Sequence, residues 1–153
     1  MTTHATTVPV TLTLTLAPEQ GTLHDIFTTA IEGGINYWCR VARYHWSVDD
    51  KGDERDYAFF AEVLDSEDED EDEDDSDGGI LATPSPRRRI DAEVILRGLV
   101  AYASMPPTER RYPLREKAIR LLMGGEVADA VDYDAEDADC IVQMGLFGQL
   151  VYG

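Results

Sequence analysis

Residues that could act on a ligand are concentrated in the stretch EGGINYWCRVARYHW, residues 32–46, which holds two tryptophans, two tyrosines, a cysteine and a histidine. Cys39 and His45 are the residue types of a nucleophilic pair, but they lie six residues apart on a predicted strand. At the usual strand rise their Cα atoms would be roughly 20 Å apart, which excludes the hydrogen bond that such a pair needs. We therefore expect no catalytic residue here, and we expect Cys39 to lie in the core.

Metal-binding and phosphate-binding patterns fail on their spacing. The three histidines and two cysteines match no metal-ligand set. Asp132-Tyr133-Asp134 resembles the start of a calcium loop, but its sixth position is Asp137 instead of glycine and its twelfth is Gln143 instead of glutamate. No glycine pair joins a strand to a helix as a phosphate loop requires. We expect no metal, no cofactor and no enzymatic activity.

Stacking and ion pairing are the chemistry that the stretch does support. If residues 35–48 form a strand, its less apolar face carries Trp38, Arg40, Tyr44 and Trp46. Flat rings beside a guanidinium suit a nucleotide-like ligand or a contact with another protein. The alternative is that helices cover this face, because clustered aromatic residues in strands are usually packing.

The acidic run DSEDEDEDEDDSD, residues 65–77, has eleven carboxylates and no basic residue. Like charges without an apolar face cannot offset the entropy of ordering, so we predict a disordered loop over residues 65–79. The loop could mimic DNA or steer the protein toward a basic partner surface, or it could only keep the protein soluble. Its carboxylates are Asp65, Glu67, Asp68, Glu69, Asp70, Glu71, Asp72, Glu73, Asp74, Asp75 and Asp77.

Composition limits the class of protein. The chain has 153 residues, 43% hydrophobic content and a formal net charge of −18, which predict a single globular domain over residues 1–153. Outside the acidic run, acidic residues still outnumber basic ones, so we expect no direct binding of nucleic acid. No apolar run approaches the roughly 18 to 20 residues of a membrane span, and no signal-peptide pattern is present. We expect a cytoplasmic protein with no membrane contact.

Hydrophobic periodicity predicts the first elements. Strict alternation predicts a strand at residues 8–16. A helix capped by Thr22 follows and ends at Gly33-Gly34 in a left-handed conformation. Strands at residues 35–48 and 57–64 form a hairpin around Lys51, with Arg40 opposite Glu62, and its core face carries Ile35, Tyr37, Cys39, Val41, Phe59, Ala61 and Val63.

The second half of the chain predicts a short strand at residues 80–83 and then helices near residues 90–104, 113–123 and 135–150. Asp134 caps the last helix, and the other acidic residues of Asp129–Asp139 favour the positive end of its dipole. The order of strand, helix, three strands and three helices predicts an α+β fold, with a small antiparallel sheet of about four strands covered by helices.

Two segments, TTAIEGGINYW (residues 28–38) and DADCIVQMGLFGQLVYG (residues 137–153), resemble a group of small uncharacterised accessory proteins of actinobacterial tailed phages. The resemblance covers the two ends of the chain and carries no known activity, cofactor or site residue. It implies a protein that acts in the cytoplasm of a bacterial host. We therefore expect a non-enzymatic accessory protein that binds a host protein, with the acidic segment aiding encounter with a basic surface. The alternative is a protein that binds or sequesters a small nucleotide-like ligand, and the oligomeric state is left open.

Overall fold

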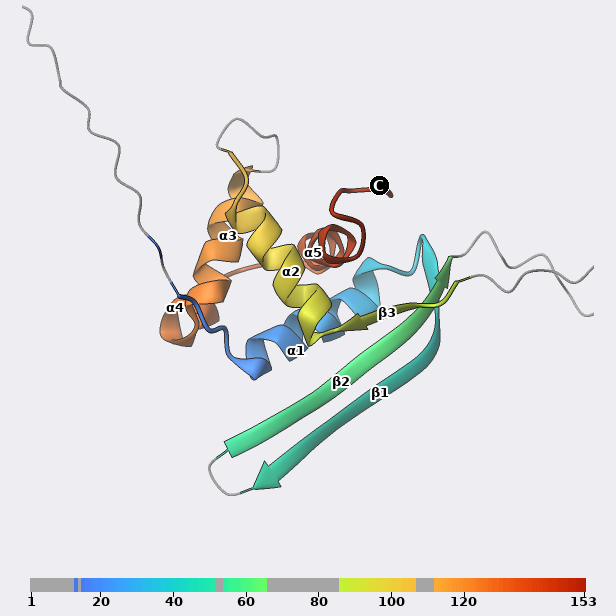
Figure 1. The fold of residues 1–153 in the computed structure, drawn as a ribbon, viewed down its shortest axis with the longest axis horizontal. Helices are drawn as coiled ribbons and strands as arrows, with labels where there is room; N and C mark the ends of the chain where they lie inside the picture. Colours follow the sequence, from blue (N-terminus) through green and yellow to red (C-terminus); the bar gives the residue numbers. More distant parts are fainter. Residues whose placement is uncertain (1–12, 14, 52–53, 66–85, 107–111) are drawn as a thin grey trace, which may run out of the picture.

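The computed structural model describes residues 13, 15–51, 54–65, 86–106 and 112–153. Within these residues a three-stranded antiparallel sheet packs against helices, so the α+β prediction is confirmed (Figure 1). The elements in chain order are α1 (Gln20–Thr29), the π-helical turn η1 (Ala30–Gly34), β1 (Cys39–Lys51), β2 (Glu54–Asp65), β3 (Arg88–Asp91), α2 (Ala92–Ala103), α3 (Tyr112–Met123), α4 (Gly125–Asp129) and α5 (Ala135–Phe147).

Several predicted elements differ from the structure. The predicted strand at residues 8–16 falls mostly outside the described residues, and its described positions 13, 15 and 16 are not in a strand. The predicted strand at residues 80–83 lies wholly outside them. Strand β3 instead forms at Arg88–Asp91, where a loop and the start of a helix were expected. Helix α2 begins later than predicted, after its N-cap Asp91. Helix α4 was not predicted.

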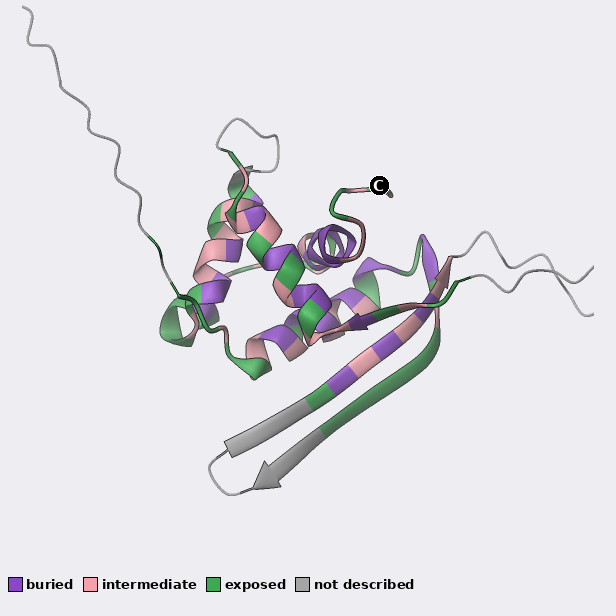
Figure 2. Cartoon of the chain, viewed as in Figure 1, coloured by how far each residue is buried: buried purple, intermediate pink, exposed green. Residues whose placement is uncertain are grey.

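Helix α5 lies at the centre of the core. Eight consecutive residues, 138–145, are buried, so the helix is covered on every side (Figure 2). As predicted, Asp134 caps it: the Asp134 carboxylate accepts a 2.9 Å hydrogen bond from the Asp137 backbone N–H. The helix ends at Gly148, whose φ of 70° is left-handed, a few residues before the predicted end.

Gly33 and Gly34 do not end a helix in a left-handed conformation, and that prediction is wrong. Neither has a positive φ, and both belong to η1, which continues α1. A Cβ on Gly34 would lie 2.6 Å from the backbone oxygen of Ala135 and 3.1 Å from the Cβ of Asp139. Glycine is needed at position 34 because η1 packs directly against the first turns of α5.

The hairpin of β1 and β2 forms as predicted, but its register differs. Arg40 lies opposite Leu64 instead of Glu62, and the innermost pair is Lys51 with Glu54. The connection is therefore residues 52–53, a two-residue loop of the length that antiparallel hairpins prefer. The predicted turn centred on Lys51 is therefore wrong, because Lys51 is the last residue of β1.

A β-bulge between Val41 and Arg43 changes which residues of β1 face the helices. On one side of it Val41 lies opposite Val63, and on the other side Tyr44 lies opposite Ala61. Because paired residues point to the same face, both pairs face the helices, although Tyr44 lies three positions after Val41, an odd spacing that would put the two on opposite faces of a regular strand. The predicted core residues Phe59, Ala61 and Val63 of β2 are buried, as are Ile35 and Cys39, whereas Tyr37 is exposed.

Helices of the described part lie on one side of the sheet (Figure 1). We call the opposite side the open face. Within the described residues, no helix is both long enough and apolar enough to cross a bilayer.

Candidate binding surface on the open face of the sheet

The four residues predicted to share one binding face do not share it. Trp38 is 3% exposed and lies in the turn before β1. Arg40 is exposed on the open face beside Leu64. Tyr44 and Trp46 are 48% and 49% exposed and lie on the helix side. The common face fails because residue 38 precedes the strand and the bulge places Arg40 and Tyr44 on opposite sides of the sheet.

Trp38 belongs instead to a buried polar network around Asp139 of α5. The indole N–H of Trp38 donates a 2.8 Å hydrogen bond to Asp139 Oδ1. The Tyr37 hydroxyl and the Gln143 side-chain amide each donate a 2.8 Å bond to Asp139 Oδ2. Three donors thus stabilise a carboxylate that is only 4% exposed, as a buried charge requires.

The same network fixes the residues after α5. The side-chain oxygen of Gln143 accepts hydrogen bonds from the backbone N–H groups of Val151 and Tyr152, at 2.9 and 2.8 Å. The ring of Tyr152 stacks on Trp38 with a centroid distance of 4.9 Å and an interplanar angle of 4°. Residues 28–38 and residues 137–153, far apart in the sequence, therefore meet at Asp139.

A hollow of about 360 Å³ opens beside this network, lined by residues that include Gly34, Tyr37, Asp139 and Cys140. Although the Tyr37 ring is largely exposed, desolvation of its hydroxyl beside the buried Asp139, and then the hydrogen bond to Asp139 and its negative charge, raise the pKa of Tyr37 to about 12. Burial, and then the charges of Asp139 and Asp65, raise the pKa of the nearby Cys39 thiol to about 12. Both groups are protonated at neutral pH and unsuited to act as base or nucleophile, so we interpret the network as structural.

The open face carries a different arrangement, which we call the Phe60 cluster: Arg43 and His45 of β1, Phe60 of β2 and Arg89 of β3. The Phe60 ring centroid lies 3.9 Å from Cζ of Arg89 and 5.5 Å from Cζ of Arg43. The His45 ring is stacked at 5.3 Å from the Phe60 ring. The middle strand thus presents one aromatic ring between cationic or titratable side chains from both neighbouring strands.

Basic and acidic side chains both lie around the Phe60 ring. Beside Arg43, the guanidinium groups of Arg87 and Arg89 lie 3.4 and 3.1 Å from the carboxylates of Glu62 and Asp91, respectively. Glu62 also lies opposite Arg43 and Arg89 in the two strand pairings. Three guanidinium groups thus face two carboxylates, on a chain with a formal net charge of −18.

A hollow of about 450 Å³ adjoins the cluster. It is lined by His45, Phe60 and Arg89 together with Asp91, Ala92 and Glu93 at the start of α2, and by the neighbouring residues 58 and 59 of β2. Apolar and charged groups of both signs surround it. It can admit a side chain or a small planar ligand in contact with the Phe60 ring and the Arg89 guanidinium.

The Phe60 cluster was not predicted, because Arg89 was expected outside the sheet and Phe60 was expected opposite a different residue of β1. Arg89 was placed in a loop before a helix, and the shifted register placed Phe60 opposite Ala42 instead of His45. Residues 87–90 are three arginines followed by isoleucine, which show no period-two alternation, so no local pattern indicated a strand there.

The acidic run begins at the end of β2. Its first residue, Asp65, lies 3.1 Å from the guanidinium of Arg88, an ion pair in which both side chains are 28% exposed. The predicted disordered loop was wrong at residue 65, which ends strand β2, and its residues 66–79 with the other ten carboxylates lie outside the described residues.

Comparison with known proteins identifies no relative: no protein-family model, curated protein or solved structure matches the chain. Among the described residues, no group of three or more histidine, cysteine or acidic side chains could hold a metal ion.

Proposed function

We propose that this chain is a non-enzymatic binding protein that contacts a partner protein through the Phe60 cluster. The observation that supports this most strongly is the sheet face that described elements leave uncovered, with Phe60 between Arg43, His45 and Arg89. Aromatic residues and arginine dominate the binding energy of protein interfaces. Guanidinium groups make charge-assisted, often bidentate hydrogen bonds to carboxylates, so the contacted partner surface carries acidic side chains.

The acidic segment has a separate role in this proposal. Its ten carboxylates beyond Asp65 attract a basic region of the partner over a distance, which raises the association rate at low salt. The Phe60 cluster then sets the dissociation rate, because short-range contacts govern how long a complex lasts. A DNA-binding protein with its basic groove is one partner of this kind. The resemblance to phage accessory proteins makes a protein of the bacterial host cytoplasm the expected partner.

The hollow beside the cluster supports a second candidate function. A planar anion, such as a nucleotide-like molecule, would stack near Phe60 and place its negative charge beside Arg43 and Arg89. The volume of about 450 Å³ lies within the range of small-molecule sites. In this alternative the protein binds or sequesters a small ligand.

The test begins with the tagged chain expressed in a bacterial host, from which co-purifying proteins are identified by mass spectrometry. The identified partner is then purified, and its binding kinetics are measured against Arg43→Ala, Arg89→Ala and the control Val100→Ala, which shortens an exposed side chain on α2. We expect each arginine variant to raise the dissociation rate about tenfold, a change of roughly 1.4 kcal/mol, with the control unchanged. Deletion of residues 66–77 retains the Asp65–Arg88 ion pair and should lower the association rate and its salt dependence.

Two outcomes would count against the proposal. Partner binding that is unaffected by both arginine variants would show that the Phe60 cluster is not the contact. Calorimetry with a panel of nucleotides tests the alternative directly. Nucleotide binding that Arg89→Ala abolishes, with no partner retained by the wild-type chain, would replace protein binding by ligand binding as the function.

A further inference from the structure

Strand β1 has a long outer edge to which no described strand is paired. The strand order is β1-β2-β3, and β1 pairs with β2 from Cys39 to Lys51. Its other side carries backbone N–H and C=O groups over thirteen residues. Such an edge is a template for an additional strand, since an incoming chain can complete the backbone hydrogen bonds.

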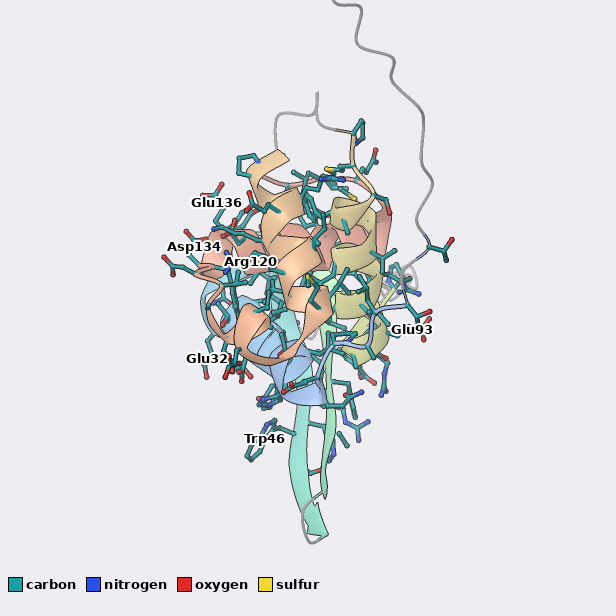
Figure 3. All side chains as sticks on the ribbon, turned by 90° about the vertical axis from the view of Figure 1, so that its left-hand side faces the viewer. Glu32, Trp46, Glu93, Arg120, Asp134 and Glu136 are labelled. Carbon is teal, nitrogen blue, oxygen red and sulfur yellow. The ribbon has the colours of Figure 1, made fainter. Side chains whose placement is uncertain are left out.

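Apolar surface on the helix side of this edge is only half covered. The ring of Tyr44 stacks on Phe27 of α1 at 5.8 Å with an interplanar angle of 9°, and the Trp46 ring lies 5.5 Å from the His24 ring. About half of each side chain is still exposed, and Trp46 projects from the hairpin beside α1 (Figure 3). A strand added to β1 with apolar residues on this side would bury the remaining halves.

The sequence contains a segment of matching pattern. Residues 8–16, VPVTLTLTL, alternate between Val or Leu on one side and Thr or Pro on the other, and none of them is charged. Such a segment buries its apolar side only by joining a sheet. Its five apolar residues would extend the helix side beside Tyr44 and Trp46, while the threonines would extend the open face.

We propose that residues 8–16 of one chain add as a strand to the outer edge of β1 in a second copy, which gives a reciprocal dimer. The second copy is favoured because the residues before α1 are held beside α4: Glu19 Oε1 accepts a 3.0 Å hydrogen bond from the Gly125 N–H. From there the described residues lead away from the hairpin of their own chain (Figures 1 and 3). Reciprocal exchange uses the same two surfaces in both copies and closes the assembly at two.

The test is the molar mass in solution, measured by light scattering after size exclusion. The wild-type chain should have twice the 17.0 kDa of one copy. The double variant Leu12→Asp with Leu14→Asp places charge on the apolar side and should reduce the mass to that of one copy. The matched control, Thr11→Asp with Thr13→Asp, adds the same charge on the other side of the same segment and should retain the dimer.

Hydrogen exchange then locates the contact. Amides of residues 43–47 whose N–H groups point away from β2 should be protected in the wild-type chain and lose that protection in the Leu12/Leu14 variant. A synthetic peptide of residues 6–17 should restore it. A wild-type mass of one copy would overturn the exchange between copies, whether or not these amides are protected. A Leu12/Leu14 variant that stays dimeric would overturn it as well. Although Arg43 and His45 of the Phe60 cluster lie on the same strand, the molar mass is measured on the chain alone, so this outcome is distinguishable from the result of the partner-binding test.

Discussion

Gly98 of α2 and Gly145 of α5 each face the backbone of the other helix. A Cβ on Gly98 would lie 2.0 Å from the backbone oxygen of Ile141, and a Cβ on Gly145 would lie 2.0 Å from that of Val94. The two helices therefore cross in backbone contact at reciprocal positions. The Arg97 side chain spans the same crossing and donates a 3.2 Å hydrogen bond to the Gly145 backbone oxygen.

Replacing either glycine by alanine should strongly destabilise the fold. A methyl group placed 2.0 Å from a carbonyl oxygen forces α2 and α5 apart, and overpacking of this kind costs about 2 kcal/mol or more. The measurement is the free energy of unfolding in urea for Gly98→Ala and Gly145→Ala. Gly33→Ala is the matched control, because its nearest neighbour would be the Ala135 Cβ at 3.4 Å. Equal stability of all three variants would show that the helices are not in backbone contact.

The sequence predicts both sides of this crossing but not the crossing itself. Helical periodicity places Gly98 and Gly145 on the apolar stripes of their helices, since residues three and four apart share a face. Only the packed structure shows that these two glycines, 47 positions apart in the chain, lie at the same helix crossing. The hairpin shows the same limit, because period-two alternation cannot reveal a bulge, and one extra residue reverses every face beyond it.

The buried network around Asp139 explains why Trp38, predicted to lie on a binding face, lies in the core instead. As one of several acidic residues near the start of a helix, Asp139 was interpreted as favouring the positive end of the helix dipole. Its donors Trp38 and Tyr37 lie 101 and 102 positions away, so no local pattern identifies them. For the same reason Trp38 was placed on the less apolar face of a strand, with its exposure or its cover by helices left open. The correct expectations, such as the Asp134 cap and helix α3, depend on contacts within a few residues.

Asp139→Asn should destabilise the protein by about 2 to 3 kcal/mol. The amide nitrogen replaces one carboxylate oxygen, so in either orientation of the asparagine a buried N–H donor, of Trp38 or of Gln143, faces another N–H group instead of an acceptor. Asp137→Asn is the control: Asp137 bonds Lys117 in a partly exposed pair, and the asparagine oxygen can still accept this hydrogen bond. Urea unfolding of both variants measures the difference. A loss no greater for Asp139→Asn than for Asp137→Asn would mean that the network does not stabilise the fold.

Alkaline pH should loosen the same region through Tyr37. Its pKa in the folded protein is raised to about 12, above the value near 10 of an unfolded chain. The stabilisation is thus complete below pH 10 and is lost as pH rises from about 10 to about 12, because only the unfolded state releases the proton in that range. Phenolate absorbance, compared between wild-type and Tyr37→Phe, should reveal one tyrosine that titrates near 12. A Tyr37 phenolate that forms near pH 10 would contradict the hydrogen bond to Asp139.

Gln143→Met should release the residues after α5 while the helix stays intact. The thioether matches the length of the amide but offers no acceptor to the N–H groups of Val151 and Tyr152, and no donor to Asp139. Loss of these bonds should cost about 1 to 3 kcal/mol and end the protection of both amides from hydrogen exchange. In a Trp46→Phe background, the emission of Trp38 should shift to longer wavelength as the Tyr152 ring leaves it. Gln149→Met, at an exposed position after α5, should change neither signal. Unchanged Trp38 emission in Gln143→Met would show that stacking alone, and not the Gln143 hydrogen bonds, holds Tyr152 in place.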